Sequence, residues 1–352
     1  VADHNYLYWP DMPFDTSEIV FSEGEALGMR IVLCRGGATQ GRAVEQDLPV
    51  ALRPETFDGY MADIELAERA FRRAVTIGET NGSDVPPTQL LKAKSSLALV
   101  LMRLGRAKDA EPIARAIVSE SQRLRGADHP DTLVTRQHWV TSLSMSGKDA
   151  EALRASDPLL ATMRARFGDN HRFTLALHST RFESFAALGR YDDAAREAER
   201  VWRGAVAQAG PHSHQALGGQ NDYAVALCQT AQRGRGVAVA RDALSSVRQA
   251  FGADYPLTHV IRYYTAECLI ANRRHAEAGA LLDGLDRQKA ADLTGRPEFG
   301  AGVDLAMAEV ALARGDRPVA MRAFTAANKV LQVTKDATTR NRLAAVRRAL
   351  TV

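Results

Sequence analysis

A loop motif recurs along this chain at a constant spacing of 42 residues. GADHPDT starts at residue 126, GDNHRFT at 168, GPHSHQA at 210 and GADYPLT at 252. A turn position keeps the same spacing and is occupied by Gly105, Gly147, Gly189, Ala231, Arg273 and Gly315. A period of this length is typical of solenoids, in which each unit buries its apolar surface against its neighbours. The chain is therefore predicted to form an array of stacked units.

Apolar residues keep fixed offsets from each turn position and predict two helices per unit. Seven and four residues before the turn stand Ala98, Val140, Phe182, Ala224, Ala266 and Ala308, and Leu101, Leu143, Phe185, Leu227, Leu269 and Ala311. Columns three residues apart form one stripe of a helix. Five residues after the turn a small residue recurs, as Ala110, Ala152, Ala194, Gly236, Ala278 and Ala320. Small side chains at one helical site predict a close crossing of the two helices.

The spacing predicts helix pairs near 88–124, 130–167, 172–209, 214–250, 256–290 and 298–332. A helix over about 61–80 is expected before them and one over about 336–350 after them. The last segment, TTRNRLAAVRRAL, has Leu343, Val346 and Leu350 on one side and arginines on the other. This pattern predicts an amphipathic cap that closes the last repeat.

The recurring loop has the composition of a link between helices. Its glycine suits the left-handed end of a helix, its proline prevents the helix from continuing, and Thr132, Thr174 and Thr258 are predicted N-caps of the next helix. The loop GPHSHQA (210–216) has no threonine, so Ser213 or His214 is expected to replace it.

The fourth unit departs most from the repeat pattern. Ala231 stands at its turn, Gly236 at its helix crossing, and Gly218, Gly219 and Gly234 lie in or beside its helices. Because an interior glycine costs about 1 kcal/mol relative to alanine, this unit is predicted to be the least stable internal repeat.

These features resemble a known repeat family. The segment LGRYDDA (188–194), the small residue at the crossing and the G-x-x-H-P-x-T loop are similar to tetratricopeptide repeats of the 42-residue type, found in kinesin light chains and many bacterial regulators. The resemblance covers roughly residues 88–330. It implies a mainly α fold, a right-handed superhelical solenoid of about six antiparallel helix pairs, acting as a non-enzymatic interaction, sensor or scaffold module.

Residues 1–60 lack the repeat columns and are predicted to be a small α/β segment, with residues 61–352 as the solenoid and its capping helices. DHNYLYWPDMPFD, LGMRIVLCRGGATQ and DLPVALRPETFDGYMADIE resemble part of an amidohydrolase-superfamily deaminase. This resemblance implies the alternative function, a metal-dependent amidohydrolase or deaminase. That family holds its metal with histidines and an aspartate along a whole barrel. After about residue 65 the chain turns into repeats, so the predicted active site is incomplete. His4 is expected to be structural or merely exposed.

Composition and charge give no support for nucleic acid or a membrane as a partner. With 45 basic and 42 acidic residues, the formal net charge of +3 does not favour nucleic acid or an anionic membrane. The sequence contains no run of ~18 apolar residues, so no membrane span is predicted. The chain starts at Val1 without the features of a signal peptide and is expected to be part of a longer protein.

Cysteines and histidines do not predict a metal site. Cys34, Cys228 and Cys268 are odd in number and lack CxxC spacing, which argues against a disulfide framework and a zinc site. Cys228 and Cys268 are expected to be core thiols, and a cytoplasmic location follows as the default. His212 and His214 lie in a loop without a third ligand and are expected to pack there. No catalytic residue, metal ligand or cofactor is predicted.

Partner binding is expected in the concave groove lined by the first helix of each pair. Side chains at two columns, and at the position beside one of them, vary in chemistry where the packing columns do not. The predicted partner-binding residues are His138, Thr141, Glu183, Asn221, Asp222, Tyr264 and Glu267. Acids in such a groove favour a protein or peptide with lysine or arginine, while a tyrosine can stack against it. Glu183 and Glu267 are expected to be exposed. The sequence predicts neither the identity of the partner nor the oligomeric state.

Overall fold

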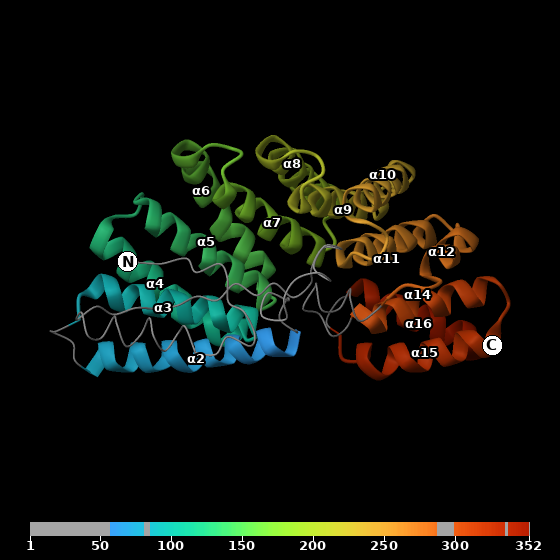
Figure 1. Ribbon diagram of the computed structural model, residues 1–352, viewed down its shortest axis with the longest axis horizontal. Coiled ribbons are helices and arrows are strands. Elements are labelled where there is room, and N and C mark those ends of the chain that lie inside the picture. The colour runs from blue at the N-terminus through green and yellow to red at the C-terminus, as the bar shows by residue number, and fades with distance from the viewer. Residues whose placement is uncertain (1–56, 81–84, 287–298, 335–336, 352) are drawn as a thin grey trace, which may run out of the picture. The chain divides into compact units, whose positions relative to one another are not determined.

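The computed structural model describes residues 57–80, 85–286, 299–334 and 337–351, and every regular element in these ranges is a helix (Figure 1). The predicted α/β segment lies almost entirely outside the described residues. The described helices group into two compact units that divide between Lys148 and Asp149. The predicted domain boundary near residue 60 falls at the first described helix and stays a prediction.

The first unit contains four described helices: α2 (Phe57–Thr80), α3 (Pro87–Arg103), α4 (Ala107–Arg125) and α5 (Pro130–Met145). Their core gathers Phe71 from α2, Leu91 and Leu101 from α3, and Ile117 from α4, with Trp139 of α5 packed against them. On α4, Ala110 and Ala114 belong to the same cluster as Ile117, and this spacing of three or four residues places them on one face of the helix.

The second unit contains ten described helices. They are α6 (Asp149–Phe167), α7 (Arg172–Ala187), α8 (Tyr191–Ala209), α9 (His214–Cys228), α10 (Arg233–Phe251), α11 (Pro256–Ala271), α12 (His275–Leu282), α14 (Phe299–Ala313), α15 (Arg317–Leu331) and α16 (Ala337–Thr351). The predicted array of helix pairs is confirmed. The second helix of the fifth pair is shorter than predicted, because α12 ends at Leu282.

The repeat columns form the core, as predicted. The small residues at the helix crossing are buried in all six pairs, with Ala110, Ala194, Ala278 and Ala320 fully inaccessible to solvent. Gly236 is the one crossing position of the six that is not alanine, and its surroundings require glycine. A Cβ built there would lie 2.8 Å from the backbone nitrogen of Cys228. The fourth pair therefore packs more closely than an alanine would permit, which counts against its predicted weakness.

The turn within each pair depends on a left-handed residue. Gly105, Gly147, Gly189 and Gly315 have φ between 70° and 77°. At the same position Arg273 is the described non-glycine residue with positive φ, at 58°.

Replacing Arg273 by glycine should raise the free energy of unfolding by about 1 kcal/mol, because a side chain in the left-handed region is strained. Chemical denaturation measures this gain. Ala231→Gly is the matched control, since Ala231 occupies the same column without a positive φ. Thr230 instead closes that turn, donating to Leu227 O at 2.8 Å and accepting from Gln232 N at 3.0 Å. An equal gain from both substitutions would contradict the strain argument.

The predicted threonine N-caps are wrong. The caps of α5 and α7 are His129 and His171, whose Nδ1 atoms accept hydrogen bonds from the backbone two residues later. Each threonine lies inside the first turn. Thr258, for example, donates to Gly252 O at 2.8 Å and so ties the loop to the helix. In the loop at 210–216, where Ser213 or His214 was the predicted replacement, Ser213 is the cap.

The prediction of two core thiols is also wrong, because Cys228 and Cys268 form a disulfide. Their Cα atoms lie 5.3 Å apart on α9 and α11, the first helices of successive pairs, and both residues are buried. The two cysteines are 40 residues apart, two fewer than the repeat period of 42, so they meet where successive first helices pack together. The cytoplasmic location rested partly on unpaired cysteines and stays a prediction.

The C-terminal helix caps the last pair, as predicted. Leu343, Val346 and Leu350 of α16 are buried in one cluster with Leu305 of α14 and Leu331 of α15. Figure 1 shows these three helices together at the C-terminal end of the second unit.

Candidate functional site

The predicted partner-binding residues are divided between the two units. His138 and Thr141 lie on α5 of the first unit, and the other five lie on α7, α9 and α11 of the second. His138 is half-buried, and burial lowers the pKa of its imidazole below the usual value. Thr141 accepts a hydrogen bond from Gln137 Nε2 at 3.0 Å.

Within the second unit the predicted residues differ in accessibility. Glu183 is exposed, as expected, whereas Asp222 and Tyr264 are half-buried. Asn221 is only 4% exposed, and its Oδ1 has no hydrogen-bond partner in the described part of the chain. Asn221 therefore lies between helices and does not face solvent, contrary to its predicted place in a groove.

Glu267 is not free, because an arginine of the C-terminal helix binds it. Arg342 of α16 makes an ion pair with Glu267 of α11 and a second, two-pronged one with Glu309 of α14. The bonds to Glu309 run from Nη2 at 2.7 Å and from Nε at 3.0 Å. Tyr263 Oη donates to Glu267 Oε1 at 2.6 Å. The expectation that Glu267 is exposed is wrong, since its side chain is 21% exposed and paired.

This network shifts the pKa values of Arg342 and Tyr263. Burial disfavours the charged guanidinium, but Glu267 and Glu309 more than offset it and raise the pKa of Arg342 well above its usual value. Burial, followed by the charge of Glu267, raises the pKa of Tyr263 well above its usual value. Arg342 therefore stays a cation and the Tyr263 hydroxyl stays a donor.

The repeat pattern places part of this network in one column. Glu183, Glu267 and Glu309 stand six residues before the turn positions Gly189, Arg273 and Gly315. Arg342 lies in the capping helix, outside the repeat pattern, so the column alone does not predict its pairing. We use the term first-helix face for the surface defined by Glu183, Asp222, Tyr264, Glu267 and Glu309 on α7, α9, α11 and α14.

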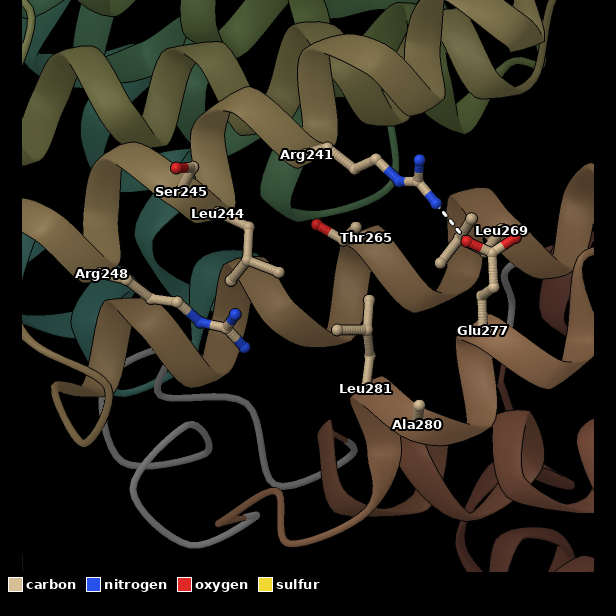
Figure 2. Close-up of a pocket in the computed structure, with 9 residues that line it drawn as sticks. All are labelled: Arg241, Leu244, Ser245, Arg248, Thr265, Leu269, Glu277, Ala280 and Leu281. Carbon is tan, nitrogen blue, oxygen red and sulfur yellow. Dashed lines mark hydrogen bonds and ion pairs between the residues drawn. The ribbon is translucent and has the colours of Figure 1, made fainter.

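A second candidate site is a pocket of about 450 Å³ formed by α10, α11 and α12 (Figure 2). Nine residues line it: Arg241, Leu244, Ser245, Arg248, Thr265, Leu269, Glu277, Ala280 and Leu281. The four residues from α10 recur at intervals of three or four, so that helix turns one face to the pocket. We call this site the arginine pocket. The arginine pocket was not predicted from the sequence, because its walls come from two successive helix pairs.

The two ends of the arginine pocket differ in charge balance. At one end Glu277 pairs with Arg241 and Arg274, and hydrogen bonds from Arg274 lower the pKa of Glu277. At the other end Arg248 makes no ion pair with any described residue. Arg262 lies near it and donates to the carbonyls of Leu281 and Asp283 at the end of α12. Burial and the neighbouring Arg248 lower the pKa of Arg262.

The described residues contain neither a cluster of metal ligands nor a membrane-spanning helix. No group of three histidine, cysteine or acidic side chains in the described ranges could hold a metal ion. None of the described helices is long and apolar enough to cross a membrane.

Comparison with known proteins places the chain near two groups. A family model described as tetratricopeptide repeat matches residues 90–131. Isoxanthopterin deaminase from an unknown prokaryotic organism is 50% identical over 113 residues, which cover 30% of this chain and 23% of that protein. The chain therefore spans less than a quarter of the length of this curated relative.

Solved structures of repeat proteins share the fold. A putative kinesin light chain with nearly identical TPR-like repeats from Podosopora anserina is 18% identical with a TM-score of 0.52, over 59% of this chain and 98% of that one. A tetratricopeptide repeat protein from Parabacteroides merdae is 13% identical with a TM-score of 0.53, over 81% and 93%. The Rap protein complexed with Competence and Sporulation Factor is 12% identical with a TM-score of 0.54, over 84% of each chain. The tetratricopeptide-type fold predicted from the repeat pattern is confirmed.

Proposed function

We propose that this chain is a non-enzymatic interaction module that binds a polypeptide partner on its first-helix face. The fold supplies a row of parallel first helices, and solenoids of this kind use such rows to hold extended or helical segments. The Rap protein, which shares the fold, was solved with Competence and Sporulation Factor bound.

The observation that carries the proposal is the pairing of Arg342 with Glu267 and Glu309. An arginine presented by an amphipathic helix is held on this face by two carboxylates from successive first helices. A two-pronged contact between a guanidinium and a carboxylate is among the stronger polar contacts in proteins. The face therefore has the chemistry to bind basic side chains on a partner.

Further acids extend this chemistry along the second unit. Glu183 is exposed on α7, and Asp222 is half-buried on α9. Tyr264 on α11 is half-buried and offers a ring that an arginine can stack against. We infer that a partner segment with several basic residues binds across α7, α9 and α11.

Selection of peptides from a random library displayed on phage, with the intact chain as bait, tests this proposal. Peptides enriched in arginine and lysine are expected. Replacing Glu183 and Asp222 together by lysine should weaken the selected peptides on the order of tenfold, because like charges then face each other.

The matched control is the double variant Asp192→Lys and Asp242→Lys. Both residues are exposed on second helices, α8 and α10, and the change in net charge is the same. Circular dichroism verifies that both double variants keep their helices. Enrichment of peptides without basic residues, or equal loss in both variants, would rule out the first-helix face.

A deaminase remains the second candidate, because 50% identity over 113 residues links part of the chain to isoxanthopterin deaminase. That activity would need a metal ion to activate water. Metal analysis of the purified chain separates the two functions. Stoichiometric zinc, iron or manganese together with deamination of a pterin would favour the enzyme.

A further inference from the structure

We propose that the arginine pocket is a second binding site, which takes an acidic segment of a partner polypeptide with an apolar side chain next to a carboxylate. This site is distinct from the first-helix face. It lies between the second helices α10 and α12, with Thr265 and Leu269 of α11 also in its lining. It favours acidic segments, whereas the first-helix face favours basic ones.

The floor of the arginine pocket is apolar. Leu244 and Leu269 are 5% and 1% exposed, and Leu281 is partly buried beside them. The hydroxyl proton of Thr265 is not available to a ligand, because Oγ1 donates to Ile261 O at 2.7 Å and has Ala240 O at 3.3 Å. A volume of about 450 Å³ over a leucine floor has the size and polarity of a site for an organic side chain and its neighbours.

The rim is cationic. Arg241, Arg248 and Glu277 line the pocket. Arg274 pairs with Glu277, and Arg262 lies near both Arg248 and Asp283. Arg241 and Arg274 share Glu277, and Arg262 is engaged with backbone carbonyls. Arg248 therefore offers its guanidinium to an incoming anion, and Figure 2 shows it at the end of the pocket away from the Arg241–Glu277 pair.

The occupant follows from the lining. Inorganic phosphate would leave the leucine floor uncovered, and the nine lining residues include no aromatic ring on which a nucleic-acid base could stack. An apolar side chain over Leu244 and Leu281, with a carboxylate on Arg248, covers both parts of the site. Charge complementarity of this kind gives specificity for acidic over basic peptides.

Fluorescence anisotropy with a labelled decapeptide of alternating leucine and glutamate tests the proposal on the intact chain. We expect saturable binding that is lost in the peptide with glutamine in place of glutamate. Arg248→Glu should weaken binding about tenfold or more. Glu277→Gln should strengthen it severalfold, because Arg241 is then released from its partner.

Two further variants separate the pocket from general attraction. Arg233→Glu is the charge-matched control, since Arg233 is exposed on α10 outside the pocket, and it should change the affinity less than about twofold. Ala280→Trp should abolish binding by filling the pocket while every arginine remains. The proposal is overturned if the peptide does not bind at concentrations up to millimolar, or if Arg248→Glu and Arg233→Glu reduce its affinity equally. It is also overturned if Ala280→Trp leaves the affinity unchanged, or if a single-stranded oligonucleotide binds in place of the peptide. Basic peptides selected on the first-helix face should bind all these variants unchanged, so either proposal can fail alone.

Discussion

Reduction of the Cys228–Cys268 disulfide should lower the free energy of unfolding of the second unit by roughly 4 kcal/mol. The bridge closes a loop across a separation of 40 residues, and opening it restores the freedom of that loop in the unfolded chain. The bridge also joins α9 to α11 beside the close approach of Gly236. Guanidinium denaturation with and without a phosphine reductant measures the difference.

The Cys228→Ala, Cys268→Ala double variant is the control and should show no response to reductant. Thiol titration in denaturant establishes how many cysteines are free before and after treatment. An unchanged unfolding midpoint, with both thiols shown to be released, would contradict a stabilising role for the bridge. Without a stabilising bridge, the prediction that the fourth repeat is the least stable internal repeat would regain support.

Truncation of Arg342 to alanine should lower the free energy of unfolding of the second unit by roughly 3 kcal/mol. The change leaves Glu267 and Glu309 together without their shared cation, and their side chains are only 21% and 15% exposed. Breaking a buried pair by removing one partner is costly, because the remaining charges stay poorly solvated. Chemical denaturation monitored by circular dichroism gives the value.

Arg348→Ala is the matched control, because Arg348 is exposed on the same helix, and it should change stability by less than about 0.5 kcal/mol. Replacing Glu267 and Glu309 by glutamine in the Arg342→Ala background should recover part of the loss. Equal effects of Arg342→Ala and Arg348→Ala would show that the network contributes nothing beyond helix content.

The repeat spacing predicted most of the fold because each structural requirement recurs at one position per unit. Ala194 and Ala320 lie at the same helix crossing, and both are fully buried. A single departure from the pattern was harder to interpret. A glycine at position 236 predicts a weak helix crossing, yet the close approach of Cys228 requires glycine there.

The candidate sites were less predictable because they depend on contacts between distant parts of the chain. Arg342 reaches Glu267 across 75 positions, and Cys228 meets Cys268 only after one repeat has brought them together. Periodicity assigns a residue to a face but does not show which other segment covers that face. Asn221 and Glu267 were therefore placed on the correct helices with the wrong accessibility.

Photo-cross-linking of a selected basic peptide to the intact chain is the most direct test of the central claim. The peptide carries a benzophenone side chain, and mass spectrometry locates the adducts. We predict adducts within Arg172–Ala187, His214–Cys228 and Pro256–Ala271, the helices α7, α9 and α11 of the first-helix face. Adducts confined to the second helices α8, α10 and α12 would contradict the claim that this face binds the partner.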